Sequence, residues 1–133
     1  MSLLVDASVA LKWFLPEVRS AAARALLDRE DDLFAPDWLL IEVANCLWKQ
    51  GRRGLVDPPQ SRKILATVQE ILHLLPSLSL APRALELAQG LDHPVYDCLY
   101  LAAAEAAGVP LITDDRRLVA VAQKHGCEVI SLG

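Results

Sequence analysis

Short apolar segments alternate with longer amphipathic segments along this chain, and this alternation constrains its fold most strongly. Apolar runs of strand length occur at residues 2–5, 33–35, 78–80, 111–113 and 128–130. Apolar residues recur at helical spacing at 8–14, 17–29, 38–50, 57–75, 82–91, 95–107 and 116–124. Short strands separated by helices favour parallel βαβ units. The sequence therefore predicts an α/β fold.

Length and composition fit one domain with its own core. We expect a single domain over residues 1–133. Apolar residues make up 53% of the chain, so the core needs no disulfides and the chain is not disordered. Cys46, Cys98 and Cys127 form no Cys-x-x-Cys pair, which is typical of reduced thiols and disfavours a zinc site.

The chain carries no feature of a membrane or secreted protein. No apolar stretch reaches the roughly 18 residues that a membrane-spanning helix needs. The apolar run 1–15 contains Asp6 and Lys12 and lacks a basic leader, so we expect a cytoplasmic protein without membrane contact. The formal net charge of −4 argues against nucleic-acid binding through bulk charge.

Three aspartates directly follow predicted strands. Asp6 comes after the first strand, and Asp114 and Asp115 come after the strand at 111–113. The carboxyl ends of parallel strands line the ligand crevice of an α/β fold. Successive side chains of an extended chain point in opposite directions, so we expect one of Asp114 and Asp115 to face the crevice and the other to cap a helix. Capping the next helix is the structural alternative for Asp6.

Two further acids lie in apolar surroundings. Glu42 occupies the apolar middle of a helix, and no lysine or arginine stands three or four residues away, so its partner must come from elsewhere. Asp97 precedes the apolar run 98–102, and capping that helix is its structural alternative. Glu105 lies eight residues later, about 12 Å along a helix, so a structural role is favoured.

These acids predict a carboxylate site for a divalent cation. Clustered carboxylates repel one another unless a cation joins them, and oxygen ligands suit Mg²⁺ or Mn²⁺. Metal-assisted phosphodiester hydrolysis is the reaction that most often needs such a site.

The other polar residues carry weaker indications. Arg116 and Arg117 adjoin the site and are candidates for phosphate contacts, whereas the basic pairs 52–53 and 62–63 are expected to be solvated. The histidines lack ligand spacing and are expected to be solvated or locally hydrogen-bonded, namely His73, His93 and His125.

Three stretches carry the pattern of a known family: LLVDAS at 3–8, PDWLLIEVANCL at 36–47, and residues 96–105 with 111–118. Their order and spacing resemble the PIN-domain ribonucleases, and within them the VapC-type toxins of toxin–antitoxin modules. The resemblance spans nearly the whole chain. It implies a PIN-like three-layer sandwich with a mostly parallel five-stranded sheet flanked by helices.

The resemblance also implies roles for individual residues. The metal-binding or catalytic acids of the family match Asp6, Glu42, Asp97 and Asp115. Positions that support the acids or the metal-bound water match Ser8, Asn45 and Thr113, and Asp114 is an additional acid at a variable position.

The implied activity is Mg²⁺- or Mn²⁺-dependent hydrolysis of RNA by metal-activated water, in a homodimer. Carboxylates that hold divalent ions are locally neutral, which weakens the objection from net charge. An antitoxin would occupy the groove, and we expect it to insert an arginine or lysine toward Asp6, Glu42 and Asp97. Its candidate apolar contacts, for which core packing is the commoner role, are Trp13, Phe14, Trp38 and Trp48.

Other interpretations remain open at this point. One is a catalytically silent PIN-like module that binds RNA or protein, and another is a PIN nuclease of RNA processing outside a toxin–antitoxin pair. A phosphotransfer receiver domain would need an acidic pair after the first strand, and a phosphatase would need a second aspartate where Ser8 stands. The sequence supplies neither.

Overall fold

A five-stranded sheet forms the centre of the computed structural model, which describes residues 2–133. The strands are β1 (Ser2–Val5), β2 (Asp32–Pro36), β3 (His73–Leu75), β4 (Leu111–Thr113) and β5 (Val129–Ser131). They lie in the order β3-β2-β1-β4-β5, and every neighbouring pair is parallel. The predicted α/β class is therefore confirmed, and the sheet is parallel throughout.

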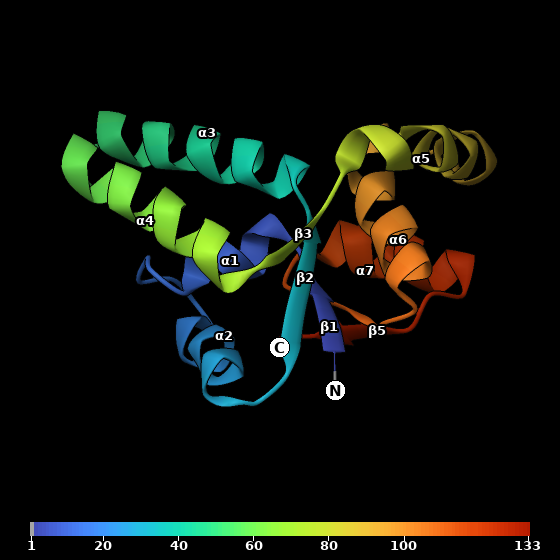
Figure 1. Cartoon of the computed structure of the whole chain (residues 1–133), viewed down its shortest axis with the longest axis horizontal. Coiled ribbons are helices and arrows are strands. Elements are labelled where there is room, and N and C mark those ends of the chain that lie inside the picture. The colour runs from blue at the N-terminus through green and yellow to red at the C-terminus, as the bar shows by residue number, and fades with distance from the viewer. Residues whose placement is uncertain (1) are drawn as a thin grey trace.

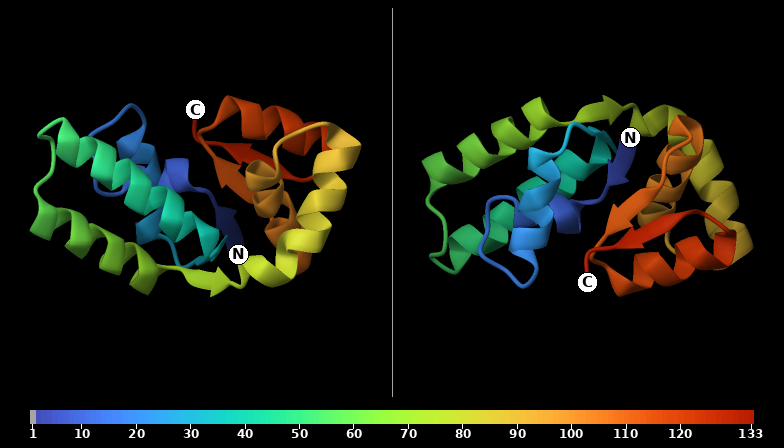
Figure 2. Two further views of the ribbon diagram at one scale, coloured as in Figure 1. Left: turned by 90° about the horizontal axis from the view of Figure 1, so that it is seen from above. Right: turned by 90° about the horizontal axis from the view of Figure 1, so that it is seen from below.

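Helices cover both faces of this sheet. Within residues 2–133 the helices are α1 (Ala7–Lys12), α2 (Ser20–Ala25), the 3₁₀ turn η1 (Leu26–Asp28), α3 (Trp38–Arg52), α4 (Pro58–Ile71), α5 (Ser77–Leu91), α6 (Val95–Ala107) and α7 (Arg116–His125). Helices α1 to α4 lie on one side of the sheet and α5 to α7 on the other (Figures 1 and 2). Right-handed crossovers produce this arrangement, because the chain moves outward from β1 to β3 and then returns to β4 beside β1. The predicted three-layer sandwich is confirmed.

The reversal of strand order places the ends of β1 and β4 side by side. In the register of this pair, Leu4 lies opposite Leu111 and Val5 opposite Ile112. Asp6 and Thr113 therefore emerge at the same level of the sheet. A crevice at the carboxyl ends of the strands is expected where the order reverses.

The core is built on the central strands and on α6. Leu3, Leu4 and Val5 of β1 are fully buried, and every residue of α6 from Cys98 to Ala104 is buried. The alanines of this helix allow it to approach β1, β2 and β4 closely. In the described part of the chain, no helix combines the length and hydropathy needed to cross a bilayer.

The segment between α4 and α5 differs from the sequence prediction. The strand expected at residues 78–80 is wrong, because those residues lie in the first turns of α5, and the strand β3 comes earlier, at His73–Leu75. The helix expected to run to Pro76 ends at Ile71 for the same reason. The apolar run 71–80 has no clear period, so the sequence did not show on which side of Pro76 the strand lies. The helix expected at 17–29 is shorter and ends in the 3₁₀ turn η1.

Candidate functional site at the carboxyl edge of the sheet

Asp6 lies at the centre of the site. It follows β1 directly, is only 5% exposed, and caps α1 by accepting a hydrogen bond from the Val9 amide at 3.2 Å. Its carboxylate also accepts hydrogen bonds from the hydroxyls of Ser8, at 2.7 Å, and Thr113, at 2.5 Å. Burial raises the pKa of Asp6 to about 6, although the hydroxyl hydrogen bonds act in the opposite direction. The capping role weighed for Asp6 and its place at the strand edge are thus both present.

Ser8 and Thr113 connect Asp6 to the turn after β4. The Ser8 hydroxyl accepts a hydrogen bond from the Asp114 amide at 3.0 Å, and the Thr113 hydroxyl accepts one from the Asp115 amide at 2.9 Å. Each hydroxyl therefore donates to Asp6 and accepts from the β4–α7 turn. The two hydroxyls fix the position of that turn relative to Asp6.

The two aspartates of this turn point to different partners. Asp115 caps α7 by accepting hydrogen bonds from the amides of Arg117 and Leu118, and its charge is among the causes that raise the pKa of Asp6. Asp114 forms an ion pair with Arg19, at 2.6 Å, and lies 3.4 Å from the ammonium of Lys12. The expectation that one of the pair caps a helix is confirmed, because Asp115 is the N-cap of α7.

Glu42 reaches the same region from α3. The hydroxyl of Tyr100, on α6, donates a hydrogen bond to Glu42 at 2.7 Å. This is the partner from another element that the sequence required. Burial raises the pKa of Glu42, the Tyr100 hydrogen bond lowers it, and the charges of Asp6, Asp97 and Asp115 raise it further.

Asp97 lies in the first turn of α6 and does not cap it. Pro94 occupies the capping position, so the structural alternative weighed for Asp97 is wrong. The Asp97 carboxylate instead lies 2.6 Å from the Nε2 atom of His93. His93 is hydrogen-bonded locally, as expected, but its partner is one of the candidate acids.

The structure thus brings four carboxylates from four segments into one electrostatic neighbourhood. No lysine or arginine of residues 2–133 forms an ion pair with any of Asp6, Glu42, Asp97 or Asp115. As they stand, no three His, Cys, Asp or Glu side chains of the described residues converge closely enough to hold a metal ion. The acids are neighbours that repel one another rather than a closed ligand cage.

The donor chemistry of this group fits a hard divalent cation. All four side chains offer oxygen, the ligand atom that Mg²⁺ and Mn²⁺ prefer. In the described residues, Glu42, Asp97 and Asp115 each have one carboxylate oxygen in a protein hydrogen bond and the other without a donor. These second oxygens are the atoms available to a cation.

The remaining candidate residues lie outside this group. Asn45 is exposed on α3, and its side chain forms no hydrogen bond within the described chain. Arg116 and Arg117 are exposed in the first turn of α7, directly after Asp115. Their guanidinium groups form no hydrogen bond or ion pair with the acids of the site in the described residues.

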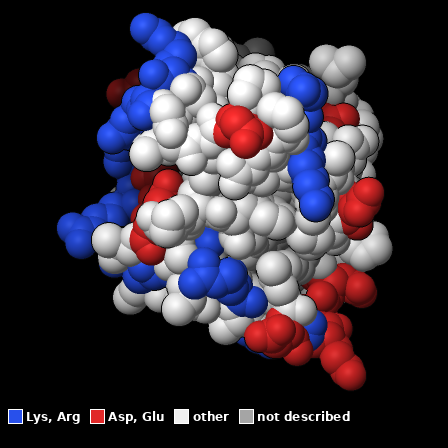
Figure 3. All heavy atoms as spheres, turned by 90° about the vertical axis from the view of Figure 1, so that its left-hand side faces the viewer, with Lys and Arg blue, Asp and Glu red and all other residues white. Residues whose placement is uncertain are grey.

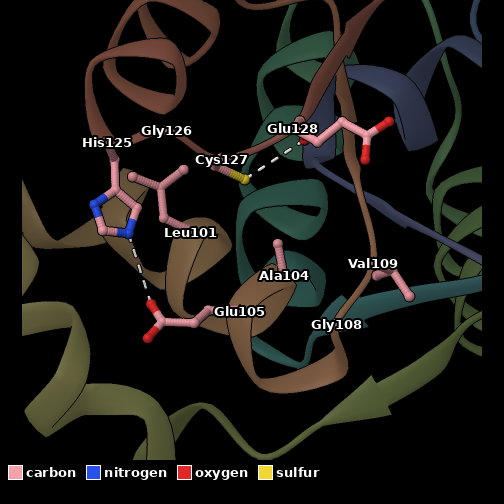
Figure 4. Close-up of a pocket in the computed structure, with 9 residues that line it drawn as sticks. All are labelled: Leu101, Ala104, Glu105, Gly108, Val109, His125, Gly126, Cys127 and Glu128. Carbon is pink, nitrogen blue, oxygen red and sulfur yellow. Dashed lines mark hydrogen bonds and ion pairs between the residues drawn. The ribbon is translucent and has the colours of Figure 1, made fainter.

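A hollow lies at the opposite, amino edge of the sheet. It has a volume of about 290 Å³ and lies between the end of α6 and the segments that lead into β4 and β5 (Figure 4). Glu105 borders it and pairs with Arg83 at 3.1 Å, while the Nε2 atom of His125 lies 3.7 Å away. The structural role expected for Glu105 agrees with these contacts.

Sequence reasoning missed the side chains that hold the acids. Tyr100 lies three residues after Asp97, on the same helix, and a buried tyrosine hydroxyl usually has a hydrogen-bond partner. That rule indicated that Tyr100 needs a partner without indicating Glu42. Lys12 and Arg19 meet Asp114 across about a hundred residues of sequence, a distance that no local pattern spans.

Comparison with protein families identifies the family to which this fold and site belong. The model of the PIN domain family matches residues 3–124. The chain belongs to the PIN-domain family. The chain is 37% identical over 123 residues to a curated relative, Ribonuclease VapC3 of Pyrobaculum aerophilum. The aligned region covers 89% of this chain and 92% of the relative. The resemblance to VapC-type proteins is thereby confirmed.

Solved structures agree with the PIN fold. A crystal structure of a Pyrobaculum aerophilum protein superposes with a TM-score of 0.73 at 27% identity, covering 99% of this chain and 92% of the other. A toxin–antitoxin complex from Klebsiella pneumoniae gives a TM-score of 0.64 at 17% identity, covering 98% of both chains. The second likeness concerns the fold alone.

Proposed function

We propose that this PIN-domain protein is a divalent-metal-dependent endoribonuclease of the VapC type. One observation carries the proposal: four carboxylates from four separate segments lie near enough for their charges to act on one another, and no lysine or arginine of the described chain is paired to them. Charges of this kind are stable together when a cation joins them. The name of the relative VapC3 supports ribonuclease activity for this chain.

The residues that would hold Mg²⁺ or Mn²⁺ are Asp6, Glu42, Asp97 and Asp115. A bound ion of this kind lowers the pKa of water and offsets the charge of a phosphodiester. Ser8 and Thr113 orient Asp6, and the Tyr100 hydroxyl orients Glu42. His93 limits the rotation of the Asp97 carboxylate.

The phosphates of the RNA would bind close to the acids. Arg116 and Arg117 stand at the start of α7, beside Asp115, and their guanidinium groups suit phosphate oxygens. Their role would be to position the strand, because phosphate contacts fix register without selecting bases.

An antitoxin and a second copy of the chain are the proposed protein partners. A chain of this fold occurs in the toxin–antitoxin complex from Klebsiella pneumoniae. A cationic side chain of the antitoxin placed among Asp6, Glu42 and Asp97 would neutralise the acids as a metal ion does. The protein would act in the cytoplasm as a homodimer.

Cleavage of a mixed RNA panel tests the proposal. The panel contains structured tRNA and rRNA fragments, and the protein is assayed with Mg²⁺ or Mn²⁺, with EDTA, and as an identically prepared Asp6→Asn variant. Cutting that needs the divalent ion and disappears in the variant is the expected result. Equal cutting by the variant would identify a contaminating nuclease, and metal-independent RNA binding without cutting would favour a silent PIN-like module.

A further inference from the structure

The outer part of the hairpin formed by α3 and α4, which excludes Glu42 and Glu70 near its base, carries a positive charge in an acidic protein. Residues 43–69 contain one acidic residue, Asp57, against five basic residues, which are Lys49, Arg52, Arg53, Arg62 and Lys63. This segment therefore carries a formal charge of +4, although the whole chain carries −4. The remainder of the protein carries −8, so the charges are separated in space.

These five side chains face solvent at the free end of the hairpin. All five are exposed, and none forms an ion pair with a carboxylate of residues 2–133. Figure 3 faces this end of the molecule and shows several lysine and arginine side chains, interspersed with acidic ones. Unpaired cations at this density attract a polyanion.

One face of α3 joins this positive end to the acidic site. Glu42, Cys46 and Lys49 are spaced by four and three residues, which places them along one stripe of the helix. Arg53, the residue that directly follows the helix, comes four residues after Lys49 and continues this stripe. At about 1.5 Å per residue, Lys49 lies roughly 10 Å and Arg53 roughly 16 Å beyond Glu42 along the axis. Cys46 lies between Glu42 and Lys49 along the helix, and the charges of both act on its thiol. A strand leaving the acids along α3 therefore meets these cations within a few nucleotides.

An apolar groove with a cationic rim lies beside this stripe. It has a volume of about 480 Å³ between α3 and α4, and its apolar lining includes Leu47, Val56 and Leu65. Trp48 lines the groove and is 57% exposed, and the guanidinium of Arg52 lies 5.0 Å from the centre of its ring. An exposed indole with a guanidinium over it offers a stacking surface for a nucleobase.

We propose that the α3–α4 hairpin binds the single-stranded RNA that flanks the scissile bond, with its phosphates on Lys49, Arg52 and Arg53 and a base on Trp48. This inference rests on the proposed ribonuclease function and assigns the surface that holds its substrate. RNA is favoured over an acidic protein because the cations continue along α3 from the cutting site itself. Aromatic stacking combined with phosphate contacts is the usual mode of single-strand binding.

Anisotropy of a fluorescent single-stranded RNA in EDTA measures binding without cutting. The test variant combines Lys49→Gln with Arg53→Gln, and the matched control combines Arg24→Gln with Lys124→Gln, a pair that is exposed on α2 and α7. Both variants lose one lysine and one arginine. Trp48→Leu removes the ring but keeps an apolar side chain in the groove.

The proposal predicts that the test variant binds RNA on the order of tenfold more weakly than the control. The slope of log Kd against log salt falls by roughly 1.4 for two lost phosphate contacts on a single strand. Trp48→Leu weakens RNA binding by about fivefold or more and leaves heparin binding unchanged, because heparin has no bases to stack. With Mg²⁺ present, KM for cleavage rises in the test variant while kcat stays near the wild-type value.

Equal RNA affinity of the test and control variants, in a wild-type protein that binds and cuts RNA, would overturn the inference and leave the proposed function intact. The hairpin would then be a docking face for a protein partner. Wild-type protein that binds RNA through the hairpin but cuts no RNA with Mg²⁺ or Mn²⁺ would support the inference and contradict the ribonuclease function.

Discussion

Titratable side chains lie at both edges of the sheet, but the two groups differ in whether ion pairs within the protein offset their charges. At the amino edge, Glu105 has Arg83 at 3.1 Å and His125 at 3.7 Å, so its charge is offset within the protein. At the carboxyl edge, the four candidate acids receive hydrogen bonds from hydroxyl, amide and imidazole groups but no ion pair from the described lysines and arginines. These four acids are Asp6, Glu42, Asp97 and Asp115.

This contrast distinguishes an acid whose charge is offset by ion pairs from acids whose charges are not. Burial raises the pKa values of Asp6 and Glu42, and the charges of the neighbouring carboxylates raise them further, so the charged forms of these acids cost stability. Under the proposed function, a bound divalent cation would offset this cost. The contact pattern therefore distinguishes the two edges more clearly than their composition does.

RNA cleavage should show the largest difference between variants at the two edges. Asp6→Asn or Asp97→Asn removes a proposed metal ligand and is expected to lower kcat/KM for RNA by about a hundredfold or more. Glu105→Gln keeps the size of the amino-edge side chain and is expected to stay within about twofold of wild type. Initial rates at saturating Mg²⁺ measure both. Equal losses in the two classes of variant would show that the edges do not differ in function.

Folding stability should respond to pH at the carboxyl edge. The pKa of Asp6 is about 6 in the folded protein against an ordinary 3.8, so its folded form holds a proton more tightly than the unfolded chain. Wild type therefore loses stability as the pH rises through 6. By linkage, Asp6→Asn gains up to about 3 kcal/mol relative to wild type between pH 4 and pH 8.

Urea unfolding in EDTA at the two pH values measures this gain. Glu105→Gln serves as the comparison from the amino edge and should show no such gain at pH 8. A destabilisation by Asp6→Asn that is the same at both pH values would contradict the raised pKa.

The hydrogen bond from Tyr100 should have a smaller, specific effect. Tyr100→Phe removes the donor that lowers the pKa of Glu42, so that pKa rises further. Because the charged form of Glu42 then appears only at higher pH, the acidic limb of the pH–rate profile moves upward. The apparent Mg²⁺ affinity is expected to fall by roughly tenfold, as for other groups that orient a metal ligand.

Tyr96→Phe is the matched control for this hydrogen bond. Tyr96 is 61% exposed and stacks on Trp38 with ring centroids 5.5 Å apart, a contact that phenylalanine retains. An unchanged acidic limb in Tyr100→Phe, or an equal shift in both variants, would contradict the positioning role of Tyr100.

Asp114 should give the smallest effect, because it belongs to the charge-compensated class although it adjoins Asp115. The Arg19 hydrogen bond lowers the pKa of Asp114, so its contribution to stability is complete above its ordinary pKa and disappears as the pH falls through the lowered value. Asp114→Asn is expected to leave Mg²⁺ affinity within about twofold and to lower the melting temperature slightly at pH 7. A large loss of metal affinity would instead identify Asp114 as a fifth ligand.

The sequence predicts the backbone frame of the site better than the side chains that complete it. Asp6 and Asp115 could be placed at one edge because β1 and β4 are short, apolar and clearly bounded, and parallel strands end at the same side of a sheet. The start of α5 could not be placed, because the apolar run around Pro76 fits strand and helix equally well.

The partners of the acids required tertiary structure. Tyr100 and Glu42 lie on helices that cover opposite faces of the sheet, and they meet only in the folded protein. Arg19 likewise meets Asp114 from a segment far away in sequence. His93 is a local partner of Asp97, four residues away, but its missing metal-ligand spacing led to its exclusion. Local patterns identify which charges are unusual, and packing decides which of them are compensated.

Binding of Mn²⁺, followed by electron paramagnetic resonance, tests the central claim most directly. The titration compares wild type with Asp6→Asn at the carboxyl edge and Glu105→Gln at the amino edge, without RNA. The account predicts that wild type and Glu105→Gln bind Mn²⁺ with the same affinity and that Asp6→Asn binds it at least about tenfold more weakly. Equal affinity in all three proteins, or loss only in Glu105→Gln, would contradict a metal site built from Asp6, Glu42, Asp97 and Asp115.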